Sequence, residues 1–217
     1  MTNPSKAAKP KRKMNDIRDD LKEINFYRAN EKPYGAFSNL YKRPIDFEGR
    51  IYPTAEHAYQ AGKARKEVVR EWILSAPTPS LLAMAAHGLY TWEIAPDWSQ
   101  TKFDRMRRVL RAKFTQHDDL RELLLSTGDV PLVETGRVDN EVNRVWGEIR
   151  GKGLNMLGVL LMELRTDLRQ GGKCGPKNFS NKVVRDVTLG RSNSLATAVQ
   201  SPAENGSIRQ SLQRGAR

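Results

Sequence analysis

Charge and apolar residues are unevenly distributed along the chain, and this confines a hydrophobic core to its middle part. Residues 1–22 carry a net charge of +4 and residues 171–217 one of +6, whereas residues 23–170 are nearly neutral at +2. The C-terminal stretch is rich in Gly, Ser, Asn, Gln and Arg, with few large apolar side chains to offset the entropy of ordering it. We therefore expect two basic tails, 1–22 flexible and 171–217 disordered, on either side of one folded domain at 23–170.

Composition excludes several classes of protein. The 217 residues suit one domain of ordinary size, and no uninterrupted apolar run is long enough for a transmembrane helix. The N-terminus is basic but no apolar stretch follows it, which argues against a secretory signal. A single cysteine, Cys174, excludes an internal disulfide and indicates a reducing, cytoplasmic compartment. We expect no membrane partner, although the basic tails could add salt-dependent attraction to nucleic acid.

The spacing of apolar residues predicts an α+β fold rich in helix. A short strand is expected at 24–27, a loop at 31–40, a hairpin at 45–52 that turns at Gly49, and another strand at 131–134. Helices are expected at 54–66, 68–73, 78–87, 99–114, 118–126 and 155–170, with Thr54 and Thr78 as N-caps. The domain is therefore expected to be a single compact unit with a few short strands.

The helix expected at 54–66 holds the strongest candidate for chemistry. Glu56, Gln60 and Lys63 are spaced i, i+4 and i+7, so they share one helical face. A carboxylate in the first turn of a helix is also favoured by the helix dipole alone, so a solvated Glu56 is the alternative. A catalytic Glu56 would need aromatic walls, for which Trp98 is a candidate. His57 points to another side of the helix and is expected to have a core or capping role.

A second candidate lies in the glycine-rich segment that follows Trp146. Gly147 to Gly153 matches neither a P-loop nor a dinucleotide-binding fingerprint. Its backbone N–H groups could still hold a phosphate in front of the helix at Asn155, with Arg150 and Lys152 beside it. A plain surface loop is the alternative. The chain has no cysteine cluster and no histidine pair at metal-ligating spacing, so we predict neither a metal site nor a cofactor.

Seven short segments, taken together and in order, resemble the NADAR family. The resemblance covers roughly residues 24–168 and leaves out both tails. The segments are Asn25–Tyr27, Tyr34–Asn39, Tyr52–Lys63, Arg111–Phe114, Leu132–Glu134, Trp146–Gly147 and Gly153–Gly158.

This resemblance implies a compact α-rich domain that hydrolyses the N-glycosidic bond between a ribose and a base. Substrates known in the family are ribosylaminopyrimidine phosphates of riboflavin biosynthesis and, in other members, ADP-ribose attached to guanine in nucleic acid. We expect a small nucleotide-like substrate of the first kind. The second kind and a non-catalytic module that binds ADP-ribose are the alternatives.

The resemblance also assigns roles to individual residues. The family's essential glutamate corresponds to Glu56, its tryptophan to Trp98, and the lysine that ends the glutamate motif to Lys63. Lys63 could pair with a substrate phosphate or form a Schiff base with the opened sugar. Glu148 stands where the family often has aspartate, and it is a candidate for a second acid or base. The candidate substrate-binding residues are Asn39, Gln60, Trp146, Gly147, Arg150, Lys152 and Asn155.

Overall fold

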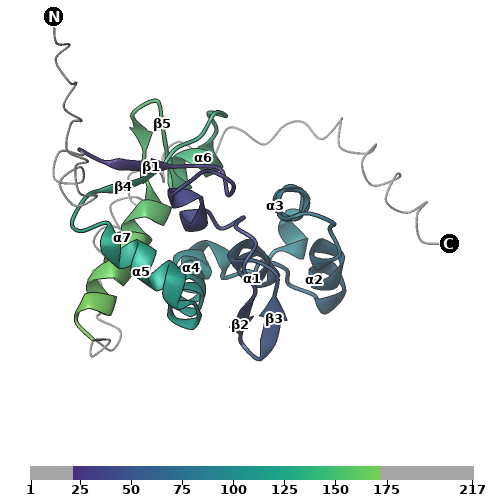
Figure 1. The fold of residues 1–217 in the computed structure, drawn as a ribbon. Helices are drawn as coiled ribbons and strands as arrows, with labels where there is room; N and C mark the ends of the chain where they lie inside the picture. Colours follow the sequence, from purple (N-terminus) through teal and green to yellow (C-terminus); the bar gives the residue numbers. More distant parts are fainter. Residues whose placement is uncertain (1–21, 172–217) are drawn as a thin grey trace, which may run out of the picture. The chain divides into compact units, whose positions relative to one another are not determined.

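Two long helices, α4 (Trp98–Gln116) and α7 (Met156–Arg169), form the centre of the computed structural model (Figure 1). The structure describes residues 22–171, so the predictions for the two tails and for Cys174 lie outside the described residues. The helices pack against each other through apolar stripes at helical spacing. The fully buried side chains of these stripes include Met106, Leu110, Phe114, Leu157, Leu160 and Leu161.

Two strands that are distant in the sequence pair on one side of α7. β1 (Ile24–Phe26) runs parallel to β4 (Leu132–Glu134), with Ile24 opposite Leu132. Both strands were expected, but their parallel pairing was not. Because α7 packs directly on β4, the end of that strand is held at a fixed place in the core.

The predicted hairpin leads straight into the first helix. β2 (Ile45–Phe47) and β3 (Arg50–Tyr52) are antiparallel, and Glu48 and Gly49 form the turn with φ angles of 55° and 76°. α1 (Ala55–Ala61) begins two residues after β3. Thr54 is its N-cap, as predicted, because its side chain accepts a hydrogen bond from the His57 N–H.

The remaining elements follow the prediction with three differences: additional short helices, the form of the glycine-rich segment, and the end of α1. The expected helices are present as α2 (Glu67–Leu74), α3 (Pro79–His87) and α5 (Asp118–Ser126). The loop expected at 31–40 contains the 3-10 helix η1 (Tyr34–Phe37), a second 3-10 helix, η2 (Thr91–Glu93), follows α3, and the short helix α6 (Glu141–Trp146) was not predicted. The glycine-rich segment forms a small hairpin from β5 (Glu148–Ile149) and β6 (Lys152–Gly153).

The third difference is that α1 ends five residues earlier than predicted. The guanidinium group of Arg105 donates hydrogen bonds to the main-chain oxygens of Ala58 and Tyr59, two carbonyls of the last turn. After Gly62 the chain extends and pairs with the segment behind η2, where Arg65 N–H donates to Glu93 O at 2.7 Å. Lys63 therefore lies just beyond the helix rather than on its third turn.

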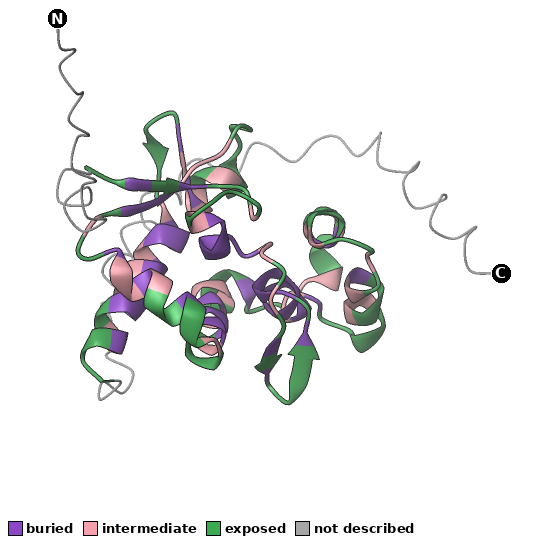
Figure 2. Ribbon diagram, viewed as in Figure 1, coloured by how far each residue is buried: buried purple, intermediate pink, exposed green. Residues whose placement is uncertain are grey.

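Burial is concentrated where the site was expected. Figure 2 shows α1 buried along its whole length, whereas α2 and α3 are mostly exposed or half-buried. A helix that is buried on all sides is normally apolar, yet α1 contains Glu56, His57 and Gln60. Buried polar groups on such a helix need a structural or chemical explanation.

Candidate active site

Glu56 is buried and has a partner on its own helix. Its exposed fraction is 8%, so the solvated alternative considered from the sequence is wrong. The side-chain amide of Gln60 donates a hydrogen bond of 2.8 Å to Glu56 Oε1. Burial raises the pKa of Glu56, and the Gln60 hydrogen bond and the charge of Lys63 partly oppose this rise. The carboxyl group is thus held in a poorly hydrated place by groups that favour its ionised form.

The N-terminal end of α1 is fixed by hydrogen bonds to neighbouring residues. The main-chain N–H of Glu56 donates to the carbonyl oxygen of Asn39 at 3.0 Å. The His57 ring Nδ1 lies 2.7 Å from Thr54 Oγ1, which confirms the capping role expected for this histidine. Glu56 therefore lies in a first helical turn that is held by Asn39 from outside the helix and by the Thr54–His57 contacts within it.

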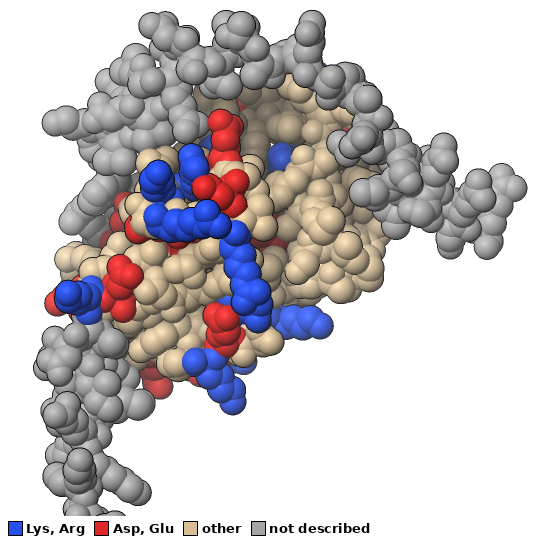
Figure 3. All heavy atoms as spheres, turned by 90° about the horizontal axis from the view of Figure 1, so that it is seen from above, with Lys and Arg blue, Asp and Glu red and all other residues tan. Residues whose placement is uncertain are grey.

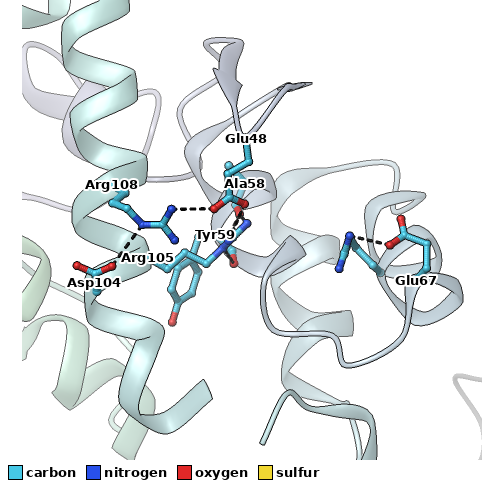
Figure 4. A network of polar contacts seen from close by, with 8 residues as sticks. Glu48, Ala58, Tyr59, Glu67, Asp104, Arg105 and Arg108 are labelled. Carbon is cyan, nitrogen blue, oxygen red and sulfur yellow. Dashed lines mark hydrogen bonds and ion pairs between the residues drawn. The ribbon is translucent and has the colours of Figure 1, made fainter. Parts of the chain in front are cut away.

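The C-terminal end of α1 is held by an ionic network. Figure 4 shows Arg105 reaching Ala58 and Tyr59, with Glu48 bridging Arg105 and Arg108. The Glu48 carboxylate lies 2.9 Å from Arg105 and 2.8 Å from Arg108. Since both arginines belong to α4, this network joins α1 to the helix that begins with Trp98.

Four aromatic side chains contact one another in a group that includes Tyr59 of α1, and we call Tyr59, Trp98, Phe103 and Trp146 the aromatic cluster. The Tyr59 ring centre lies 5.0 Å from that of Trp98 and 5.4 Å from that of Trp146. Phe103 lies 5.4 Å from Trp146 on its other side. Burial and the charge of Glu56 raise the pKa of Tyr59, which places the cluster within electrostatic reach of that carboxyl group. Both predicted tryptophans thus contact Tyr59, which follows Glu56 by three residues on the same helix.

A second carboxyl group, Glu134, joins the site from the end of β4. Burial, together with the charge of Glu56, raises the pKa of Glu134 to about 8. Its main-chain N–H donates to Asn155 Oδ1 at 3.0 Å, which fixes the strand end against the start of α7. Glu134 was not among the residues selected from the sequence. The only signal was its place in the Leu132–Glu134 segment, because the parallel pairing that positions it is not readable locally.

Lys63 lies on the other side of Glu56. Its ammonium group donates a hydrogen bond of 2.6 Å to the carbonyl oxygen of Ala86. Burial lowers the pKa of Lys63, the charge of Glu56 opposes this, and the charge of Lys102 adds to it. Burial also lowers the pKa of Lys102. Lys63 and Lys102 are therefore both partly dehydrated and repel each other electrostatically, and neither has a salt bridge to a carboxylate among the described residues.

Asn39 and Gln60 each hold a buried oxygen with no partner. Asn39 Nδ2 contacts the sulfur of Met106 at 3.4 Å, and Gln60 Nε2 is used by Glu56, but within residues 22–171 neither Oδ1 nor Oε1 accepts a hydrogen bond. Unpaired acceptors of this kind cost free energy unless a ligand or a water donates to them. Both residues were candidates for substrate binding, and both contact Glu56: Gln60 through its side-chain amide and Asn39 through its main-chain oxygen.

The glycine-rich segment does not have the predicted form. The N–H groups of Leu154 and Asn155, which could have faced a phosphate, donate to Arg144 O at 2.6 Å and Gly147 O at 3.2 Å. The side chain of Asn155 is also used internally, since its amide donates to Leu132 O at 2.8 Å. The N–H groups of Leu154 and Asn155 are therefore not available to a phosphate, because they already have partners inside the protein.

The other predicted residues of this segment lie on the hairpin. Arg150 and Lys152 are exposed, and their charges contribute to lowering the pKa of Asp139. Glu148 is half-buried on β5, and no hydrogen bond or ion pair within the described residues joins it to Glu56. Gly147 is needed for close packing, since a Cβ there would lie 2.4 Å from Glu134 O. Gly147 thus acts on the site through the strand end that carries Glu134.

The described residues hold neither a metal-binding cluster nor a membrane-spanning helix. No three histidine, cysteine, aspartate or glutamate side chains between residues 22 and 171 lie close enough to hold a metal ion. No helix in this part of the chain is both long and apolar enough to cross a membrane.

Comparisons with known proteins agree with this geometry. N-glycosidase YbiA from Escherichia coli (strain K12) is 42% identical over 146 residues, which are 67% of this chain and 88% of that protein. N-glycosidase Npun_R5314 from Nostoc punctiforme is 37% identical over 150 residues, 67% of this chain and 92% of that protein. Riboflavin biosynthesis protein VVA0006 from Vibrio vulnificus is 32% identical over 158 residues, 71% of this chain and 41% of that protein.

The fold is also similar to a solved structure. The NMR structure of E. coli YbiA matches with a TM-score of 0.61 at 35% sequence identity, over 74% of this chain and 96% of that chain. The match confirms the expected α+β architecture. The family model described as the NADAR domain matches residues 25–169. The chain therefore belongs to the NADAR domain family.

Proposed function

We propose that this protein is an N-glycosidase that hydrolyses the bond between a ribose and a nitrogenous base. The observation that supports this most strongly is the buried carboxyl group of Glu56 together with the half-buried one of Glu134, whose pKa is raised by burial and by the charge of Glu56, in a domain that also holds the aromatic cluster. Two relatives named as N-glycosidases are 42% and 37% identical to this chain, and each match covers 67% of it. The proposed chemistry requires no cofactor, and the lone cysteine favours a cytoplasmic location for it.

The two carboxyl groups suit the two halves of the reaction. When the bond between C1 and the base nitrogen breaks, positive charge develops on the ribose ring and negative charge on the base. Glu56, whose ionised form is supported by Gln60 and Lys63, would stabilise the ring charge and activate the attacking water. Glu134 has a pKa of about 8, so it is mostly protonated at neutral pH and could donate a proton to the leaving base.

The surrounding groups suit a nucleotide-like molecule. The indole rings of Trp98 and Trp146 could stack on a flat base or wall the pocket, a contact worth roughly 1–3 kcal/mol per base in nucleic-acid complexes. The unpaired oxygens of Asn39 and Gln60 could accept hydrogen bonds from ribose hydroxyl groups. We therefore assign these residues to the sugar, and the lysines near Glu56 to a substrate phosphate.

Lys63 retains two possible roles. Its ammonium group could pair with a phosphate of the substrate. Alternatively, because burial lowers its pKa, the neutral amine could attack C1 and displace the base, which leaves with a proton. Opening of the ribose ring, with a proton passing to the ring oxygen, would turn the resulting glycosylamine into an imine, and water would hydrolyse this imine to release the sugar and the free lysine.

We propose a ribosylaminopyrimidine phosphate of riboflavin biosynthesis as the substrate. The Vibrio vulnificus relative carries a riboflavin biosynthesis name. A guanine that carries ADP-ribose in nucleic acid is the second candidate, favoured by the net charges of +4 and +6 in residues 1–22 and 171–217. On the face seen in Figure 3, basic and acidic side chains are interspersed and lie beside a broad uncharged surface, so this face does not form a continuous basic patch.

One experiment separates these candidates. The full-length protein is incubated with ribosylaminopyrimidine phosphate, with the same ribosylated base lacking the phosphate, and with DNA that carries ADP-ribose on guanine. The released base is identified by mass. Release of free pyrimidine from the phosphorylated compound is the expected result. Tight binding of ADP-ribose with no base released from any substrate would identify a binding module and contradict the proposal.

A further inference from the structure

Lys113 is a buried cation that the proposed chemistry does not use. It lies in the last turn of α4 with an exposed fraction of 0%, and no carboxylate in the described part of the chain pairs with it. Its ammonium group donates to two main-chain oxygens, Ala36 O at 2.6 Å and Ser38 O at 2.9 Å. It also lies 5.6 Å from the centre of the Tyr41 ring. Because such burial is costly for an ammonium group, its two carbonyl partners are central to its retention there.

These two carbonyls belong to the segment that leads to Glu56. The Ser38 carbonyl is bonded to the nitrogen of Asn39, and the carbonyl oxygen of Asn39 accepts the Glu56 N–H at 3.0 Å. A single residue therefore separates the lysine contact from the contact with α1. The segment is packed tightly at the same place, since the Phe37 ring centre lies 6.1 Å from that of Phe114, the neighbour of Lys113.

The Asn39 carbonyl controls how α1 begins. The N–H groups in the first turn of a helix have no partner inside the helix, and Asn39 supplies one for Glu56. If this carbonyl moved, the first turn could rotate or fray, and the Glu56 carboxyl group would move with it. A displacement of about 1 Å in a catalytic group can lower a reaction rate by about a hundredfold.

We propose that Lys113 is a positioning residue for Glu56. By binding the carbonyls of Ala36 and Ser38, it fixes the backbone that leads into Asn39. The Asn39 carbonyl oxygen in turn holds the N–H of Glu56, and with it the helix turn that carries the carboxyl group. The role in turnover rests on the proposed glycosidase function, whereas the mechanical link between Lys113 and the Glu56 N–H does not. Two separate readouts are therefore needed.

The test compares two variants of Lys113 with a core control in the full-length protein. Lys113→Met keeps the length of the side chain and removes all donors, and Lys113→Gln keeps a donor for one carbonyl. Leu124→Ala is the control, because Leu124 is also 0% exposed but lies on α5 and lowers stability by opening a cavity. Turnover is measured per folded molecule well below each melting temperature, and hydrogen exchange of the Glu56 amide is followed by NMR.

We expect kcat to fall by about ten- to a hundredfold in Lys113→Met and by less in Lys113→Gln, with KM changed by less than about twofold. Exchange of the Glu56 amide is expected to accelerate in both variants and not in Leu124→Ala. Wild-type kcat and amide exchange in a folded Lys113 variant would overturn the proposal, as would failure of both variants to fold, which would assign Lys113 to stability alone. If the wild type releases no base, the proposed function fails, and the exchange measurement alone decides the mechanical link.

Discussion

Replacing Glu134 by glutamine, which cannot ionise, is expected to stabilise the protein at neutral pH and at the same time to reduce its activity. The carboxyl group has an ordinary pKa of 4.5, and burial next to Glu56 raises this to about 8 in the folded protein. Between these values the unfolded chain has released the proton while the folded protein still holds it. Folding must then take up a proton, so the free energy of unfolding falls as the pH rises from 4.5 towards 8.

The size of the effect follows from the shift. Each pKa unit corresponds to about 1.4 kcal/mol, so the roughly 2.5 units between the ordinary value and pH 7 cost about 3 kcal/mol. Glutamine resembles the protonated acid and does not titrate, and it avoids this cost. The difference in unfolding free energy between Glu134→Gln and wild type should therefore be about 3 kcal/mol larger at pH 7 than at pH 4.5, in favour of the variant.

Urea unfolding followed by circular dichroism, at several pH values from 4.5 to 8, measures this difference directly. Comparing the two proteins at each pH cancels groups that titrate in both, such as Lys113, whose pKa is lowered to about 7 by burial. Glu122→Gln is the matched control, since Glu122 is exposed on α5 and its replacement should change stability by less than about 0.5 kcal/mol at every pH. The kcat of Glu134→Gln should fall by about a hundredfold or more, as expected for loss of a proton donor.

A difference between Glu134→Gln and wild type that stays constant with pH would refute this reasoning. It would mean that Glu134 is ionised in the folded protein and cannot act as the acid. If Glu134→Gln is stabilised at pH 7 but retains full turnover, the raised pKa of Glu134 is correct but its role as a proton donor is not.

Three further predictions concern other parts of the protein. Borohydride should trap a covalent substrate adduct in wild type and not in Lys63→Met if the lysine is a nucleophile, and absence of any adduct in wild type would leave it the phosphate-binding role. Deleting residues 1–22 and 171–217 should leave hydrolysis of a small phosphate unchanged, whereas activity on an ADP-ribosylated DNA should fall, and the fall should depend on salt. Thr54→Ala should lower the free energy of unfolding by about 1 kcal/mol, measured by urea titration, because it removes the α1 cap and both His57 contacts to the Thr54 hydroxyl; an unchanged midpoint would show that this cap does not stabilise the protein.

Local signals in the sequence predicted most of the elements. Thr54 and Thr78 each precede a helix that they cap, and the stripe from Met106 to Phe114 faces the core as its spacing indicated. The early end of α1 was not predictable in this way, because it depends on Arg105, which comes more than 40 residues later in the chain and supplies the hydrogen bonds that end the helix. A helix end fixed by a distant side chain leaves no mark in the local pattern.

The site was predictable where its residues lie on one helix or form an obvious aromatic motif. Glu56 and Gln60 meet because they are four residues apart, and the resemblance to the family pointed to Trp98. Glu134 was missed because a single acidic residue at a strand end looks like any exposed charge until the strand is paired and covered. The opposite error occurred at Asn155, whose polar side chain looked available for a ligand but braces β4 instead.

The central claim is that the Glu56 carboxylate acts at the anomeric carbon, and single-turnover release of the base by Glu56→Gln tests it most directly. Glutamine preserves the size of the side chain and can still bond to Gln60, so the fold and substrate binding should be retained while the rate of base release falls by at least about a thousandfold. Rapid release at the wild-type rate, by a variant shown to be folded and saturated with substrate, would contradict the account.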